Sequence, residues 1–121
     1  MTTVTPTLVE LPTNYQGFKC WQVQWAGMTN GAGGVPVNLV EFSDRSVQVE
    51  GTFGVGGNVA VQGSNDLVNY ELLRDPSSTV LNLTAVGLHG ILELSGAIRP
   101  VVTAGDGTTS LTVTMVFRRT W

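Results

Sequence analysis

The sequence predicts an all-β protein, built as one antiparallel β-sandwich of about eight short strands in a jelly-roll arrangement. Apolar residues alternate with polar ones in several short runs, which is the period of a half-buried strand. Gly, Asn, Asp and Pro separate these runs at spacings of roughly 8 to 14 residues. No full-length amphipathic helix and no repeat of fixed period is visible, which argues against helical, solenoid and propeller folds.

The chain of 121 residues is long enough for one hydrophobic core and too short for two. We expect an extended N-terminal arm over residues 1–16 and a single sandwich domain over residues 17–121. Only 12% of the residues are charged, about half the share of an ordinary soluble domain. Much of the surface must therefore be uncharged, and any apolar part of it is expected to lie against something else.

The arm is rich in Thr and Pro, a composition that predicts extended chain with little tendency to form a helix. Its scattered apolar residues are Val4, Leu8, Val9 and Leu11. An extended segment of this kind is able to add a strand to the exposed sheet edge of a neighbouring chain. The alternative is a frayed terminus that makes no contact.

The first strand of the body begins at Phe18, where alternation places Trp21, Val23 and Trp25 on the expected core face. A glycine-rich loop over residues 27–34 follows. The remaining expected strands are residues 37–39, 47–53, 59–62, 70–73, 80–83, 97–103 and 110–117. On the last of them, alternation points Leu111, Val113, Met115 and Phe117 inward. We expect the strands over 59–62 and 70–73 to form a hairpin, because a Ser-Asn-Asp turn follows the first of them.

Residues 81–94 fit two structures. Their apolar residues match a helical stripe, but Gly87 and Gly90 would each cost a helix about 1 kcal/mol. The stripe consists of Leu81, Ala85, Leu88 and Leu92. We expect a strand, then a turn or one short helical turn, then a second strand.

Cys20 and His89 are the single cysteine and the single histidine of the chain. A nucleophile and its base must lie within hydrogen-bond reach, and no sequence feature brings these two together. We interpret Cys20 as a buried, inert thiol and His89 as an exposed or interface imidazole. A zinc site needs three or four ligands, and the required paired spacing is missing. We therefore expect no enzyme, no catalytic residue, no cofactor and no bound metal.

Asp44, Asp66, Asp75 and Asp106 each lie next to Ser, Asn, Pro or Gly, where Asp side chains cap turns. We interpret all four as turn residues, and a calcium ion held by loop carboxylates is the alternative. The chain also has a cluster of glycines that consists of Gly51, Gly54, Gly56 and Gly57. This cluster does not predict a phosphate-binding loop, because we expect a strand rather than a helix to follow it.

The net charge of −3 argues against nucleic acid as a direct partner, because phosphate-binding surfaces need clustered Lys and Arg. The single basic pair, Arg118 and Arg119, is interpreted as a solvated strand end. We expect synthesis in the cytoplasm and no membrane insertion, because the N-terminus lacks the pattern of a signal peptide and no window approaches 18 apolar residues. The sequon at residues 82–84 is then formal only.

Three stretches carry a resemblance: EGTFG at residues 50–54, VAVQGSND at 59–66 followed by Tyr70, and IRPVVTAGDG at 98–107. They resemble small virion proteins of tailed bacteriophages, in particular capsid decoration or cement proteins. That resemblance implies a non-enzymatic jelly-roll subunit on the outer capsid surface that bridges neighbouring major-capsid subunits. It transfers no functional residues. A component of the phage tail or of head completion would share these traits.

The hairpin at residues 63–66 with Tyr70 is also similar to one in discoidin-like carbohydrate-binding sandwiches. Trp21, Trp25 and Trp121 would be the candidate sugar platforms, although the first two alternate into the expected core face. A secreted or cytosolic binding module is a third class. We expect the major capsid protein as the partner, and homodimers or homotrimers, because closed symmetric contacts would cover an uncharged surface.

Overall fold

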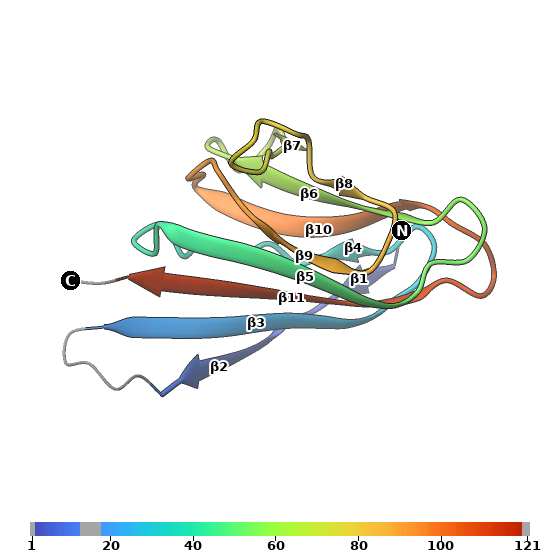
Figure 1. Ribbon diagram of the computed structural model, residues 1–121, viewed down its shortest axis with the longest axis horizontal. Helices are drawn as coiled ribbons and strands as arrows, with labels where there is room; N and C mark the ends of the chain where they lie inside the picture. Colours follow the sequence, from blue (N-terminus) through green and yellow to red (C-terminus); the bar gives the residue numbers. More distant parts are fainter. Residues whose placement is uncertain (1, 13–17, 120–121) are drawn as a thin grey trace.

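Eleven β-strands make up the regular structure of the computed structural model, which describes residues 2–12 and 18–119 and has no helix within those ranges. The strands form two sheets packed face to face (Figure 1), which confirms the predicted sandwich. The strands are β1 (Thr3–Val4), β2 (Thr7–Leu11), β3 (Lys19–Met28), β4 (Gly33–Gly34), β5 (Asp44–Thr52), β6 (Asn58–Ser64), β7 (Glu71–Leu72), β8 (Asn82–Leu83), β9 (Gly87–Gly90), β10 (Ala97–Ala104) and β11 (Ser110–Arg119).

The strand order is that of a jelly roll. One sheet has the order β2-β3-β11-β5-β9, and the other has the order β1-β4-β10-β6-β7, with β8 also paired to β6. When β1, β2 and β8 are set aside, the remaining eight strands place the first, last, third and sixth in one sheet. The second, seventh, fourth and fifth form the other sheet, which is the double Greek key of a jelly roll. The predicted jelly roll is therefore confirmed.

The alternation predicted for the first and last strands of the body is present. On β11 the inward residues are Leu111, Val113, Met115 and Phe117. On β3, Val23 and Trp25 are fully buried and Trp21 packs against the same core, so the predicted core face is correct. The indole Nε1 of Trp25 donates a hydrogen bond of 3.0 Å to the carbonyl of Val35.

The facing sheet supplies the other half of the core. Its inward residues on β6 and β10 include Val59, Val61, Ile98 and Val102, all with no exposed surface. Burying one side chain of this size contributes about 1.5–3 kcal/mol. The core therefore lies between β6 and β10 on one side and β3, β11 and β5 on the other.

The strand expected at residues 37–39 is wrong. Val37 makes only an isolated bridge to Ile98, and the strand β4 lies instead at Gly33 and Gly34, inside the expected loop. Both glycines are buried. A Cβ atom on Gly34 would lie 2.7 Å from Pro100 Cδ and 2.8 Å from Trp25 Cδ1, so only glycine lets the backbone pass so close to these rings.

The N-terminal segment is extended, as predicted, but it pairs with its own chain. β1 runs parallel to β4 at the edge of one sheet, and β2 runs antiparallel to β3 at the edge of the other. The alternative of a frayed terminus that makes no contact is therefore wrong for residues 3–11. Within the described residues, β2 is the last strand of its sheet and has an open outer edge, so the expected contact with a neighbouring chain stays a prediction. The predicted boundary between arm and body lies outside the described residues.

Residues 73–95 cover the side of the sandwich opposite β1 and β2, where β7 and β9 are the edge strands of the two sheets. The Leu92 amide donates to the Arg74 carbonyl at 2.8 Å, and the Leu81 amide donates to the Leu73 carbonyl at 2.8 Å. Residues 81–94, which fitted both a helix and strands in sequence, form the strands β8 and β9 joined by a turn, so the helical alternative is wrong. Gly87 and Gly90 fit this result, since glycine costs a strand edge less than a helix interior.

Candidate interaction surface

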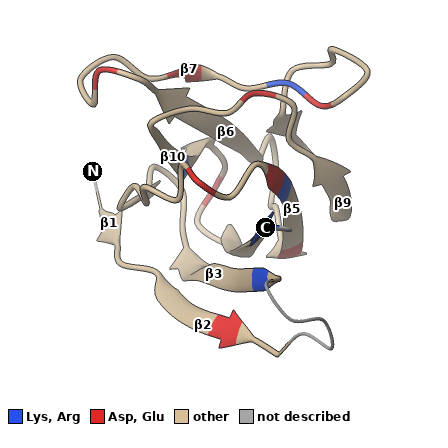
Figure 2. Cartoon of the chain, turned by 90° about the vertical axis from the view of Figure 1, so that its left-hand side faces the viewer, with Lys and Arg blue, Asp and Glu red and all other residues tan. Residues whose placement is uncertain are grey.

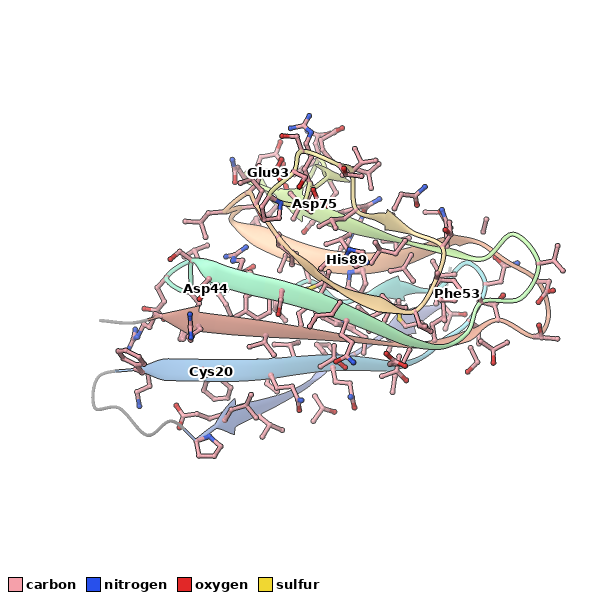
Figure 3. The ribbon with its side chains drawn as sticks, viewed as in Figure 1. Cys20, Asp44, Phe53, Asp75, His89 and Glu93 are labelled. Atoms are coloured by element: carbon pink, nitrogen blue, oxygen red, sulfur yellow. The ribbon has the colours of Figure 1, made fainter. Side chains whose placement is uncertain are left out.

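Cys20 and His89 are far apart in the fold and cannot act as a nucleophile and base. Cys20 lies on the outer face of β3, while His89 lies on β9, opposite the inward-facing Val47 of β5 (Figure 3). Two strands, β11 and β5, separate β3 from β9 in the sheet. Burial raises the pKa of the Cys20 thiol, although Arg118 lowers it in part, so the unreactive thiol form is favoured.

Three of the four candidate carboxylates cap turns, as predicted. Asp66 Oδ1 accepts hydrogen bonds from the amides of Val68 (2.9 Å) and Asn69 (2.8 Å), which hold the pKa of this carboxyl well below its usual range. Asp106 accepts from the Thr108 hydroxyl and the Val55 amide, and its pKa falls to about 2. The Asp75 carboxylate accepts from the amides of residues 77 and 79.

The prediction that Asp44 caps a turn is wrong. Asp44 is the first residue of β5 and forms an ion pair with Arg118 on the adjacent strand β11 instead of capping a turn. Arg119 pairs with Glu41 at 3.0 Å, so both members of the basic pair are engaged within the chain. Among the described residues, no cluster of three or more His, Cys, Asp or Glu side chains is arranged to hold a metal ion.

Gly54, Gly56 and Gly57 lie in the turn between β5 and β6, Gly51 lies in β5, and a strand follows them as predicted. Gly54 and Gly56 have φ values of 71° and 72°, which a residue with a Cβ adopts only with strain. Asp106 of the β10–β11 turn holds this loop in place. Its carboxylate accepts a hydrogen bond of 2.8 Å from the Val55 amide. No helix N-terminus follows these glycines, so the loop lacks the geometry that cradles a phosphate.

The tryptophans do not form a sugar platform in the described part of the chain. Trp25 has no exposed surface, Trp21 packs on the core, and Trp121 lies outside the described residues. Tyr70, the aromatic residue of the hairpin that resembles carbohydrate-binding sandwiches, has one ring face covered by the Arg99 guanidinium at 3.9 Å from the ring centroid. The residues proposed for stacking on a sugar are therefore mostly engaged inside the protein.

Exposed apolar side chains are concentrated along residues 67–94. Charged residues are sparse along the chain (Figure 2). Within residues 2–12 and 18–119, eight of the twelve exposed large hydrophobic side chains lie in this segment, so its side of the sandwich is the best candidate for an interaction surface. They are Leu67, Val68, Leu72, Val80, Val86, Leu88, Leu92 and Leu94. Alternation alone did not identify them, because most lie in loops or in strands of two to four residues.

A polar groove of about 410 Å³ opens on the same side, between β7 and residues 93–95. Arg74 and Glu93 form an ion pair of 3.2 Å in its wall, and Glu93 also accepts the Arg74 amide at 2.7 Å. Asn65, Asn69 and Glu71 complete the polar lining. The groove has hydrogen-bonding groups, but its single cation, Arg74, is already paired with Glu93, and Glu71 adds a second carboxylate.

The fold and surface together define a jelly-roll domain with exposed apolar side chains concentrated on one side. No family model and no curated protein matches the sequence. Among solved structures, the chain is similar to the SPBc2 prophage-derived protein YomS, with a TM-score of 0.63, 9% identity, and coverage of 90% of this chain and 99% of that one. This likeness supports the fold.

A second solved structure is the Cnp3 cupin domain of Schizosaccharomyces pombe. It has a TM-score of 0.41 and 13% identity, and the alignment covers 91% of this chain and 58% of that one. The described residues contain no helix that is long and apolar enough to cross a membrane.

Proposed function

We propose that this protein is a non-enzymatic structural component of a bacteriophage virion. It is made in the host cytoplasm, decorates the outer capsid surface, and cements the capsid by bridging neighbouring major-capsid subunits. The observation that carries the proposal is the concentration of exposed apolar side chains along residues 67–94. A small monomeric domain gains nothing from exposing them to water, whereas a subunit that docks onto a lattice buries them.

Two further observations support the proposal. The sparse charge leaves a surface that costs little to desolvate on assembly, because burying charged groups is expensive unless they are paired. The similarly folded YomS is described as a prophage-derived protein and is matched over almost its whole length. A phage origin for this chain is part of the proposal and rests on that likeness together with the resemblance of residues 50–66 and 98–107.

Self-association belongs to the same proposal. We expect a homodimer or homotrimer, because a closed symmetric contact would bury part of the apolar side and leave the rest for the capsid. Sedimentation velocity over a range of concentrations measures this directly. A monomer at every concentration would contradict self-association and would leave the bridging of capsid subunits to single copies.

The proposal is tested by adding the purified protein to capsids of the same phage that lack it. The expected result is saturable binding, and higher capsid stability against heat or loss of divalent cations when the sites are filled. Binding to isolated tails or head-to-tail connectors instead would assign the protein to tail or head completion. Binding to a glycan array with no capsid binding would favour the carbohydrate-binding alternative.

A further inference from the structure

Arg99 differs from the other five cations of the chain. Four of them form ion pairs, namely Lys19 with Glu10, Arg74 with Glu93, Arg118 with Asp44, and Arg119 with Glu41. The fifth, Arg45, is buried and donates to backbone carbonyls. Arg99 lies on β10 and has no carboxylate partner among residues 2–12 and 18–119.

The Arg99 side chain is nevertheless held in place. Its guanidinium carbon lies 3.9 Å from the centroid of the Tyr70 ring, and its Nε donates to Gln62 Oε1 at 3.0 Å. Gln62 is the residue opposite Arg99 in the pairing of β6 with β10. These contacts fix the plane of the guanidinium and leave its two terminal nitrogens without a partner in the described structure. Two parallel N–H donors in that arrangement match the two oxygens of a carboxylate.

The loop over residues 64–70, which contributes the Tyr70 ring that contacts Arg99, also presents apolar side chains to solvent. Leu67 and Val68 are 56% and 78% exposed, and Leu67 adopts a φ of 64°, which is uncommon for a bulky residue. The loop is fixed by Asp66, which accepts hydrogen bonds from the amides of Val68 and Asn69. It is also fixed by Ser64, whose hydroxyl accepts a hydrogen bond of 2.9 Å from the Leu67 amide. The fold therefore holds a strained backbone that displays two apolar side chains to solvent.

We infer that Arg99, Tyr70 and the 64–70 loop form a docking surface for a protein partner that presents a carboxylate beside an apolar recess. Resting on the proposed function, that partner is the major-capsid subunit. The carboxylate supplies the ion pair that Arg99 lacks within its own chain, and the recess takes Leu67 and Val68. Arg and Tyr carry much of the binding energy in protein interfaces, and pre-ordered side chains lose little entropy when they bind.

The first experiment measures binding to capsids that lack the protein. Arg99→Gln and Arg99→Lys are each expected to weaken binding at least about 30-fold, because glutamine removes the charge and lysine removes the paired donors. Arg118→Gln is the matched control and should bind like the unchanged protein, since Arg118 is exposed, already paired with Asp44, and lies on β11 in the other sheet. Equal thermal unfolding midpoints show that the variants are folded. Equal binding by Arg99→Gln would overturn the inference and leave the proposed function standing.

The second experiment needs no capsid. The side-chain resonances of Arg99 and Arg74 are followed by NMR while sodium acetate is added, with sodium chloride at equal ionic strength as the reference. We expect a saturable response of Arg99 that Arg74 does not show and that Tyr70→Leu removes. If the unchanged protein fails to bind capsids, the proposed function fails, and this titration alone decides the carboxylate site. Equal responses of Arg99 and Arg74 would overturn it, and tighter binding of sialic acid than acetate would replace the protein partner with a glycan.

Discussion

The carboxylate of Asp106 accepts a hydrogen bond of 2.8 Å from the amide of Val55, although the two residues lie 51 positions apart in the chain. This contact joins the β10–β11 turn to the β5–β6 turn at one end of the sandwich. The same carboxylate also caps its own turn through the amide and hydroxyl of Thr108. One ionised side chain therefore holds two loops from different parts of the sequence.

The first prediction concerns acid stability. The pKa of Asp106 is lowered from its ordinary value of 3.8 to about 2 by hydrogen bonds from Thr108 and Val55, and the pKa of Asp66 is lowered in the same direction by the amides of Asn69 and Val68. A carboxylate whose pKa is lower in the folded state stabilises that state above its unfolded pKa, and the stabilisation is lost as pH falls toward the folded pKa. Thermal unfolding midpoints should therefore fall as the pH drops from 4 toward 2.

Asp106→Ala is the variant that tests this cause. This variant should have a lower unfolding midpoint at neutral pH. Its midpoint should also decline less below pH 4, because the protonation of Asp106 no longer contributes to the pH dependence of stability. Glu50→Ala is the control, since Glu50 is an exposed carboxylate of β5 that accepts from the nearby Gln48 side chain and joins no two loops. A pH profile of Asp106→Ala parallel to that of the unchanged protein would contradict the assignment.

The second prediction concerns the close approach at Gly34. Gly34→Ala should destabilise the fold by about 1–3 kcal/mol or more, because the added methyl group meets Pro100 and Trp25 at 2.7–2.8 Å, below any normal contact distance. Urea unfolding followed by tryptophan fluorescence measures the change. Gly107→Ala is the matched control, since nothing lies within 4 Å of its Cβ position. Similar stabilities of the two variants would contradict the packing described for β4.

The third prediction concerns the buried guanidinium. Arg45 is only 5% exposed, donates to the carbonyls of Phe42 (2.9 Å) and Leu39 (3.0 Å), and lies over the Phe117 ring. Arg45→Ala should cost about 1–3 kcal/mol, because two buried carbonyls lose their donor. Arg74→Ala removes an exposed, paired arginine and should cost about 0–1 kcal/mol. Equal losses in urea unfolding would show that burial does not distinguish the two residues.

The fourth prediction concerns the N-terminal segment. Deleting residues 2–11 should lower the free energy of unfolding by about 1–3 kcal/mol, because the backbone bonds of β1 and β2 to β4 and β3 are lost. Val4 also packs against the core. Leu8→Thr, a change at an exposed position of β2, is the control and should have little effect. A deletion variant as stable as the intact chain would show that the segment does not hold the free subunit together.

The sequence predicts buried positions correctly in strands where apolar and polar side chains alternate. The alternation on β3 and β11 identified Val23, Trp25 and Phe117 as inward residues, because each of these strands has one face in the core. It failed at β4, because Gly33 and Gly34 have no side chains to show an alternation, and their burial depends on rings contributed from elsewhere in the chain.

The candidate interaction surface was harder to predict for a similar reason. The Arg99 guanidinium is held in place by Tyr70 and Gln62. Both are distant from Arg99 in sequence and come close to it through the pairing of β6 with β10. The burial of Arg45 follows from its inward position on β5 next to Phe117, which also depends on a pairing between distant segments. The turn roles of Asp66 and Asp106 were predictable, because capping depends on neighbouring residues.

Binding of the protein to the outside of a phage capsid can be observed by cryo-electron microscopy of capsids that lack the protein, before and after incubation with it. We expect added density of jelly-roll shape at fixed positions on the outer lattice, in contact with more than one major-capsid subunit. Capsids that stay bare at saturating protein concentration would contradict the proposal.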